Sequence, residues 1–351
     1  MSSNTAANLI EAQAHEIAGQ AWAELQTAYS NIEDRFGPDA EALWTDHLQQ
    51  RLIELSVALN AGDAKLFAAR LAWSRSAMQS RGLTAEDIDN SLKALSTALA
   101  SQLSQSAADA ARNCISEANN TLLRNAEAGL ASQLDPGLPN HRLALQYIQA
   151  VVAGNVLPGM ELVLDAVERG LSINDAYLEV LLPAQTEVGR LWHLNSISVS
   201  EEHLVSYTTQ RLMATIASRA QRKPDNGYTA VAGAVVGNVH DIGIRAIAYL
   251  MEIEGWRTIY LGSDIPQTEL PNTLDSFEAD VLLLSVALTS QLPDTARTIQ
   301  SIRDSGEHPV KILVGGNGLS ESPDLWREIG ADGYATGAGQ ALALALEMVT
   351  L

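Results

Sequence analysis

His240 has the sequence surroundings of a metal ligand. It lies in residues 237–243, GNVHDIG, between a short apolar run at 231–236 and an amphipathic stretch that starts at residue 242. Imidazole is well suited to ligate cobalt, iron or copper, and its second ring nitrogen needs a partner that fixes the tautomer. Asn238 and Asp241 are the candidates for that partner. The alternative is a turn histidine that binds no metal.

Glycines and one serine accompany three further apolar runs. Ser285 closes the run at 281–286, Gly315 and Gly316 follow the run at 311–314, and Gly333 and Gly337 frame the last run. Glycine leaves room for a bulky group to approach the backbone, and Ser285 offers a hydroxyl in the same region. The pattern predicts a ligand-binding edge rather than isolated turns.

The elements that must position these residues alternate between short strands and amphipathic helices. Strands are predicted at 231–236, 258–261, 281–286, 311–314 and 333–336, with a helix at 242–254 after the first. This alternation is typical of a doubly wound, mostly parallel sheet with helices on both faces, in which ligands bind at the carboxyl ends of the strands. We therefore predict a Rossmann-like or flavodoxin-like domain over residues 227–351.

The preceding sequence is helical, and breaks divide it into two parts. Residues 134–140 contain two prolines and a glycine, and residues 223–227 read KPDNG. Apolar residues recur every three or four positions between these breaks. We predict an all-helical domain of five or six helices at 1–135 and a four-helix bundle at 140–222. The fold class is therefore multi-domain, α followed by α/β.

Composition narrows the possible functions. The 42 acidic and 22 basic residues give a formal charge of −20, without a basic cluster that would favour direct DNA binding. No apolar run is long enough to span a membrane, and the N-terminus lacks a secretory pattern, so we expect a cytoplasmic protein. The single cysteine, Cys114, excludes an intrachain disulfide and a multi-cysteine zinc site.

Residues 227–351 resemble the cobalamin-binding family, whose pattern is Asp-x-His-x-x-Gly, then a serine at a strand end, then Gly-Gly. The resemblance implies that His240 is the lower axial ligand of cobalt and that the nucleotide tail fills a slot. Two positions depart from the pattern: Asn238 replaces the aspartate, and Ala287 stands where leucine is common. The implied cofactor-binding residues in this domain are Asn238, Val239, Asp241, Ile242, Gly243, Ser285, Ala287, Thr289, Gly315, Gly316, Gly333 and Gly337.

The bundle has a polar and aromatic cluster of its own. Trp192 and His193 are followed by Glu202 and His203. Taken alone, core packing is the favoured explanation for Trp192, and a surface position is the favoured explanation for His203. Beside a cobalamin domain, the spacing resembles light-sensing regulators of the CarH type. This resemblance implies that Trp192 caps adenosylcobalamin, Glu202 contacts its ribose, His193 is the upper axial ligand in the light state, and His203 is a pocket neighbour.

The N-terminal helices resemble globin-like sensor modules, and the three-part arrangement resembles the photocobilins, which pair adenosylcobalamin with biliverdin. This resemblance implies that Arg70, Trp73 or Arg81 meets a biliverdin. The alternatives are a dimerisation or partner-binding domain, or a haem site at His15 or His47.

Three functional hypotheses follow from these resemblances. The first is a non-enzymatic light sensor that forms light-dependent homo-oligomers and acts on an unknown signalling partner. The second is a corrinoid methyl carrier of a methyltransferase system, because such proteins share the bundle and the cobalamin domain. The third is a fragment of a cobalamin-dependent mutase.

Overall fold

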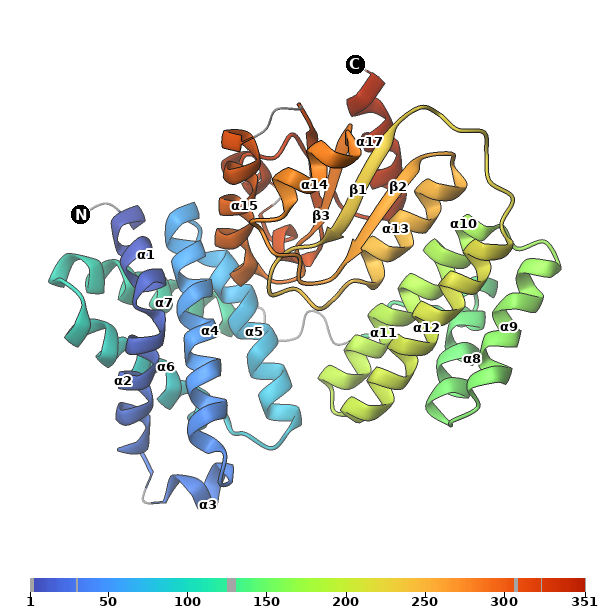
Figure 1. The fold of residues 1–351 in the computed structure, drawn as a ribbon. Helices are drawn as coiled ribbons and strands as arrows, with labels where there is room; N and C mark the ends of the chain where they lie inside the picture. Colours follow the sequence, from blue (N-terminus) through green and yellow to red (C-terminus); the bar gives the residue numbers. More distant parts are fainter. Residues whose placement is uncertain (1–2, 30, 125–130, 306–308, 323, 351) are drawn as a thin grey trace. The chain divides into compact units, whose positions relative to one another are not determined.

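A computed structural model describes residues 3–29, 31–124, 131–305, 309–322 and 324–350 (Figure 1). The chain forms two compact units, Met1–Gly129 and Leu130–Leu351. The predicted helical stretch includes residues 125–130, which lie outside the described residues. None of the described helices is both long and apolar enough to cross a bilayer.

The first unit is helical throughout its described residues. Gly62 ends α4 in the left-handed conformation, the Asp63 side chain caps α5, and Thr84 and Asp87 form a capping box at the start of α6. The number of helices among the described residues of this unit is larger than the five or six that were predicted. The reason is that Gln13 separates the first two helices and a short helix follows the second. They are α1 Ser3–Ala12, α2 Ala14–Gln26, α3 Ile32–Phe36, α4 Ala40–Ala61, α5 Ala64–Ser80, α6 Ala85–Gln102 and α7 Gln105–Arg124.

Asp87 connects several elements of this unit. Its side chain is almost fully buried and accepts hydrogen bonds from Tyr29 Oη at 2.8 Å and Arg35 Nη2 at 2.5 Å, in addition to the Thr84 backbone N–H. Burial raises the pKa of this carboxyl, but the hydrogen bonds from Arg35 and Thr84 outweigh it and hold the pKa at about 2. Asp87 is therefore ionised in the folded unit at any ordinary pH.

The second unit begins with a helical bundle. Its third helix is continuous from residue 173 to residue 193, and its middle turn is a π-helix directly before Pro183. Proline has no backbone N–H and cannot donate the hydrogen bond to the carbonyl four residues earlier. The π-helical turn therefore lies next to the position where the regular α-helical hydrogen bond is missing. The elements are α8 Pro139–Val152, α9 Val156–Glu168, α10 Ile173–Asp175, η1 Ala176–Leu181, α11 Leu182–His193 and α12 Val199–Arg219.

A parallel sheet follows, with strand order β2-β1-β3-β4-β5. The strands are β1 Thr229–Ala234, β2 Arg257–Gly262, β3 Val281–Ser285, β4 Lys311–Gly315 and β5 Gly333–Ala335. The helices are α13 Ile242–Ile253, α14 Leu270–Phe277, α15 Leu292–Ser305, α16 Leu325–Glu328 and α17 Ala338–Thr350, with short turns η2 Thr289–Gln291 and η3 Asn317–Leu319. The chain runs outward from β1 to β2 and then returns to β3, so the switch point lies between β1 and β3.

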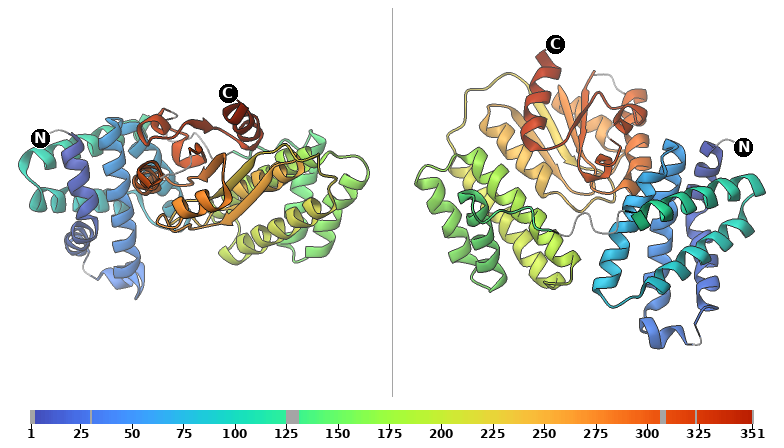
Figure 2. Two further views of the ribbon diagram at one scale, coloured as in Figure 1. Left: turned by 45° about the horizontal axis from the view of Figure 1, so that its top comes forward. Right: turned by 180° about the vertical axis from the view of Figure 1, so that it is seen from behind.

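Helices cover both faces of the sheet (Figures 1 and 2). Ala230, Ala232 and Ala234 of β1 share a core with α13 and α17, while α14 and α15 lie on the other face. Small alanines on the strand let the helices pack closely. The structure confirms the predicted fold class of helical regions followed by a Rossmann-like parallel sheet.

The bundle and the sheet domain are joined by apolar packing. Ala246 and Leu250, on the outward face of α13, belong to the same buried cluster as Val205, Leu212 and Ile216 of α12. The bundle therefore rests on α13 rather than on the strands.

Candidate functional site

The predicted metal ligand lies at the switch point of the sheet. His240 belongs to the loop between β1 and α13, and its side chain is exposed. Its backbone N–H donates to Asn238 Oδ1 at 2.9 Å, and Asn238 Nδ2 donates to the Ser285 carbonyl oxygen at 2.9 Å. Asn238 is fully buried. Its amide thus joins the loop after β1 to the end of β3, and its oxygen contacts the His240 backbone rather than the imidazole.

Two residues that the sequence analysis did not single out complete this loop. Gln291 Oε1 accepts from the backbone N–H groups of Ala287 and Leu288, and its Nε2 donates to the Gly237 carbonyl at 3.0 Å. Asp264 Oδ1 accepts from the Gly237 N–H at 2.7 Å. The loops after β1, β2 and β3 therefore hold one another in place, and the loop that carries His240 is fixed from both sides.

Asp241, the second candidate partner of the imidazole, has other contacts in the structure. Its Oδ2 accepts from Tyr260 Oη and from Arg245 Nη2, both at 2.6 Å, and its Oδ1 accepts from Gln210 Nε2 at 3.2 Å. The Arg245 guanidinium also lies over the Tyr260 ring, 4.9 Å from its centroid. Burial and Asp241 both raise the pKa of Tyr260. Burial alone lowers the pKa of the Arg245 guanidinium. The hydrogen bond to Asp241 and the neighbouring charges raise this pKa by more, so the net shift is upward.

The predicted glycines fall into two groups. A Cβ on Gly315 would lie 2.9 Å from the Ala335 carbonyl oxygen, and one on Gly316, whose φ is +107°, would lie 2.4 Å from that of Val286. The fold itself requires these two glycines. Gly333 begins β5, where a Cβ would press on Leu313 and Met348.

Gly243 and Gly337 form the second group. A Cβ at either position would meet no protein atom within 4 Å, and neither residue has a positive φ. Gly243 stands in the first turn of α13, where alanine is favoured over glycine. The fold leaves room for a side chain at both positions, so a ligand bound at this edge could approach the backbone there.

The remaining predicted residues of this edge differ in exposure. Thr289 is buried, and its hydroxyl lies 3.4 Å from the Gly318 carbonyl oxygen. Ser285 and Ala287 are half-buried, and Ile242 packs against the core shared with the bundle. Val239, next to His240, is 72% exposed.

The four predicted bundle residues lie at the end of α11 and the start of α12. His193 is buried, Trp192 is half-buried, and His203 is exposed. Ser198 caps α12, and Glu202 Oε1 lies 2.5 Å from the Ser206 hydroxyl. The helix α12 reaches the His240 loop through Gln210, whose Nε2 donates to Asp241.

In the first unit, the residues considered for a tetrapyrrole lie on α5 or at its C-terminal cap. The Arg70 carbonyl accepts from Arg51, Arg81 bonds the Ala77 carbonyl, and Trp73 is exposed. Burial and the nearby Arg51 charge lower the pKa of His47 to about 3. Biliverdin binding and a haem site both stay predictions.

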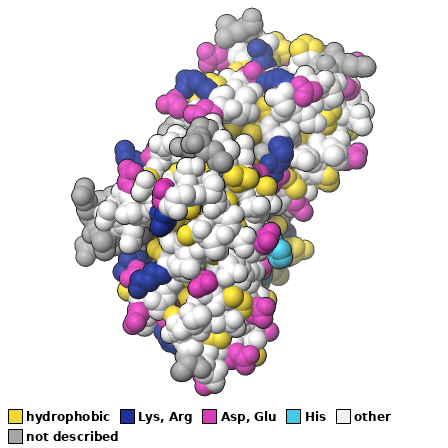
Figure 3. All heavy atoms as spheres, turned by 90° about the vertical axis from the view of Figure 1, so that its left-hand side faces the viewer, with side chains coloured by type: hydrophobic (Ala, Val, Ile, Leu, Met, Phe, Trp, Pro, Cys, Tyr) yellow, Lys and Arg dark blue, Asp and Glu magenta, His cyan; other side chains and the backbone are white. Residues whose placement is uncertain are grey.

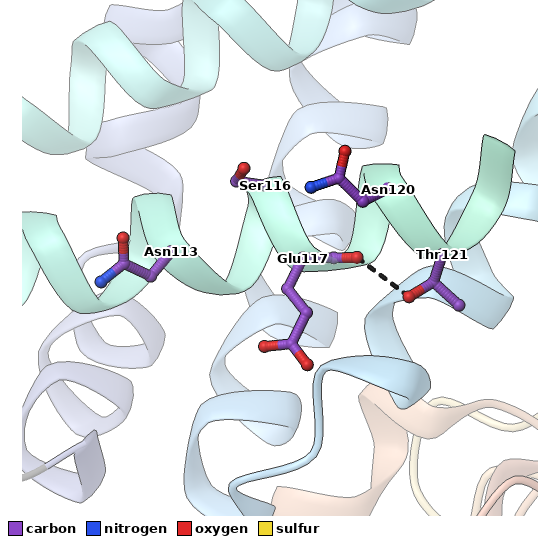
Figure 4. Close-up of a pocket in the computed structure, with 5 residues that line it drawn as sticks. All are labelled: Asn113, Ser116, Glu117, Asn120 and Thr121. Atoms are coloured by element: carbon purple, nitrogen blue, oxygen red, sulfur yellow. Dashed lines mark hydrogen bonds between the residues drawn. The ribbon is translucent and has the colours of Figure 1, made fainter. Parts of the chain in front are cut away.

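Other surface features of the described residues offer little chemistry. A shallow polar pocket on α7 is lined by Asn113, Ser116, Glu117, Asn120 and Thr121, with Thr121 bonded to the Glu117 carbonyl (Figure 4). Within the described ranges, no cluster of three or more His, Cys, Asp or Glu side chains could hold a metal ion. On the face in Figure 3, basic side chains are interspersed with acidic ones.

Two B12 binding domain models match the chain, one over residues 228–343 and the other over residues 143–217. Dimethylamine corrinoid protein 3 of Methanosarcina mazei is 31% identical over 121 residues, covering 34% of this chain and 71% of that protein. Dimethylamine corrinoid protein 1 of Methanosarcina acetivorans is also 31% identical over 121 residues, but this chain spans only 55% of its length. A corrinoid protein of Desulfitobacterium hafniense is 28% identical over 204 residues, covering 56% of this chain and 93% of that protein.

Among solved structures, the monomethylamine corrinoid protein of Methanosarcina barkeri matches with a TM-score of 0.50 and 22% identity. The match covers 59% of this chain and 99% of that one, and it supports the fold alone.

These relatives correct the first functional hypothesis. The light sensor was inferred from the spacing between Trp192-His193 and Glu202-His203. The relatives, however, are named as corrinoid proteins and favour the methyl-carrier alternative. The reason is that both classes share a helical bundle before a cobalamin domain, so a tryptophan and a glutamate in that bundle separate them poorly. The chain belongs to the family of B12-binding corrinoid proteins.

Proposed function

We propose that this chain is the corrinoid methyl carrier of a methyltransferase system. The observation that carries the proposal is the rigid loop at the β1–β3 switch point, which presents the exposed His240 beside the open backbone of Gly243. A flat macrocycle needs an axial ligand and free space beside it, and this edge of the sheet provides both. The cobalt of a bound cobalamin supplies a site that accepts and releases a methyl group.

Each part of the edge has a proposed role toward the cofactor. His240 would be the cobalt ligand, and Asn238 would hold its loop. Ser285, Thr289 and Gly315 would contact the nucleotide tail of the cofactor. The complete proposed set on the sheet domain also includes Val239, Asp241, Ile242, Gly243, Ala287, Gly316, Gly333 and Gly337.

The residue at position 238 affects how the imidazole binds the cobalt. An aspartate in this position would give the imidazole a charged acceptor, whereas the Asn238 amide is neutral and already contacts the backbone. We therefore expect His240 to be a weaker donor to cobalt than a histidine paired with a carboxylate.

The bundle residues are proposed to border the upper face. Trp192, His193, Glu202 and His203 lie at the α11–α12 corner, where they would shield the reactive face from water until a methyltransferase binds. In this proposal the group that the cofactor would carry is methyl rather than adenosyl. The partners are a methyltransferase that donates the methyl group and one that receives it.

Reconstitution tests this proposal. The full chain, incubated with aquocobalamin, should carry a corrinoid absorbance through gel filtration. His240→Ala should lower the affinity at least ten-fold, about 1.4 kcal/mol, and alter the visible spectrum. His15→Ala, an exposed histidine of the first unit, is the matched control and should change neither property.

A second measurement addresses the methyl transfer. The reduced holo-protein should be methylated by a methylamine or methanol methyltransferase, with a corresponding change in its absorbance. A wild-type protein that stays colourless after gel filtration rejects cobalamin binding. A coloured protein that no methyltransferase methylates rejects the carrier role.

A further inference from the structure

We propose that Gln210 is a positioning residue that couples the helical bundle to the loop carrying His240, through its hydrogen bond to Asp241. This inference rests on the proposed function and deepens it. A partner that moves the bundle would thereby change the support of the loop that carries His240.

The contact joins two parts of the second unit. Gln210 belongs to α12, and Asp241 is the N-cap residue of α13, directly after His240. Gln210 Nε2 donates to Asp241 Oδ1 at 3.2 Å, and the Asp241 side chain is only 7% exposed. A hydrogen bond to a buried carboxylate is stronger than one between neutral groups. This contact can therefore transmit a displacement of α12.

The other contacts of Asp241 come from the sheet domain. Arg245 lies one turn later on α13, and Tyr260 is on β2. These two donors hold Oδ2, whereas the bundle holds Oδ1. The carboxylate is thus shared between the sheet domain and the bundle, and loss of one donor shifts it toward the others.

The same helix carries the proposed upper-face residues. Glu202, Ser206 and Gln210 are spaced by four residues and lie on one side of α12. Glu202 and Gln210 are about 12 Å apart along the helix axis, at 1.5 Å per residue. Glu202 is within 2.5 Å of the Ser206 hydroxyl, which is also 3.0 Å from Gln185 of α11. A change at the α11–α12 corner therefore acts on a rigid rod whose next two turns reach Asp241.

Two substitutions of Gln210 that differ in charge can distinguish a positioning hydrogen bond from simple packing of the side chain. Gln210→Glu keeps the size of the side chain but places a second carboxylate against Asp241. Gln210→Leu removes the donor without adding charge. If the contact positions His240, Glu should be the worse substitution; if Gln210 only fills space, Glu should be the milder one.

The experiment uses the full chain and aquocobalamin. Gln210→Glu should weaken cofactor binding at least ten-fold, and Gln210→Leu by about three-fold. After reduction to the cobalt(II) form, electron paramagnetic resonance of protein labelled with ¹⁵N-histidine reports nitrogen coupling from the axial imidazole. The fraction showing this coupling should fall in the same order, from wild type to Leu to Glu.

Gln149 provides the matched control, because it is exposed on α8 of the same bundle. Gln149→Glu and Gln149→Leu should behave as wild type. A Gln210→Glu protein with wild-type affinity and coupling overturns the inference, as does a reversed order of the two variants. His240→Ala without loss of the nitrogen coupling would instead reject His240 as the ligand, and with it the proposed site.

Discussion

Replacing Gly243 with alanine should separate the stability of the sheet domain from its affinity for the cofactor. Gly243 is in the first turn of α13, and a Cβ there would meet no protein atom within 4 Å. Alanine is favoured over glycine in a helix by roughly 0.5–1 kcal/mol. Because the position is near the helix end, we expect about 0.5 kcal/mol of added stability in the cofactor-free protein, or about 1–2 °C in Tm.

The same methyl group should interfere with cobalamin. If the corrin lies against the backbone at this position, the added carbon occupies its contact surface, and such overpacking costs about 1–3 kcal/mol. The dissociation constant for aquocobalamin should therefore rise by about five-fold to 150-fold. Thermal unfolding without cofactor and titration with aquocobalamin, followed by absorbance, measure the two effects separately.

Gly318 gives the opposite pattern and serves as the comparison. A Cβ there would lie 2.9 Å from the Leu288 backbone and 2.9 Å from a Val286 side-chain atom, so Gly318→Ala should destabilise the cofactor-free protein by about 1–3 kcal/mol. Wild-type affinity in the Gly243→Ala protein would refute the reasoning. So would a loss of stability in that variant as large as in Gly318→Ala.

Two further predictions concern the first unit. The pKa of the Asp87 carboxyl is about 2 in the folded unit and about 3.9 in the unfolded chain. The ionised carboxylate therefore stabilises the folded unit by about 2 kcal/mol at pH values above about 4, and this contribution is lost as the pH falls from 4 to 2. Asp87→Asn should therefore lower the protection of α6 amides from hydrogen exchange at pH 7 but matter little near pH 2; an equal deficit at both pH values would contradict this. Burial raises the pKa of the Cys114 thiol to about 11, and Glu117 makes a smaller contribution. Because the thiolate is the form that reacts, alkylation by iodoacetamide at pH 8 should be at least about ten-fold slower in the native chain than in the denatured chain. Equal alkylation rates, measured by mass spectrometry, would show that the thiol is accessible.

The sequence was sufficient to predict the sheet domain because its signals are local. Five short apolar runs appear where the strands lie, although β1 spans Thr229–Ala234 rather than residues 231–236. The His240 loop was predicted at the carboxyl end of this strand, which is where the structure has it. Strand ends and tight loops leave a clear mark in residue type, so this part of the site could be located.

The contacts around the loop could not be predicted in the same way. Asn238 and Asp241 were the two candidate partners of the imidazole, but their side chains contact Ser285 and Gln210, which are distant in the sequence. A glutamine within a regular helix gives no sign of the contact it makes. Asp264 likewise gives no sign in the sequence of its contact with the Gly237 N–H, because the two residues are far apart along the chain.

The function was the least determined, for a related reason. Trp192 and Glu202 were predicted to lie above the cofactor, but side-chain type alone does not report which group the cobalt would carry. Similarity to corrinoid proteins favoured the methyl carrier.

The apolar cluster shared by α12 and α13 has a consequence for how this protein can be divided. Ala246 and Leu250 belong to the sheet domain by connectivity but to the bundle by packing. Cleavage of the chain within residues 223–227 followed by separation of the two parts would expose an apolar surface on each of them. The two halves should melt in a single cooperative step, and natural variation should insert new modules before residue 130 more readily than between them.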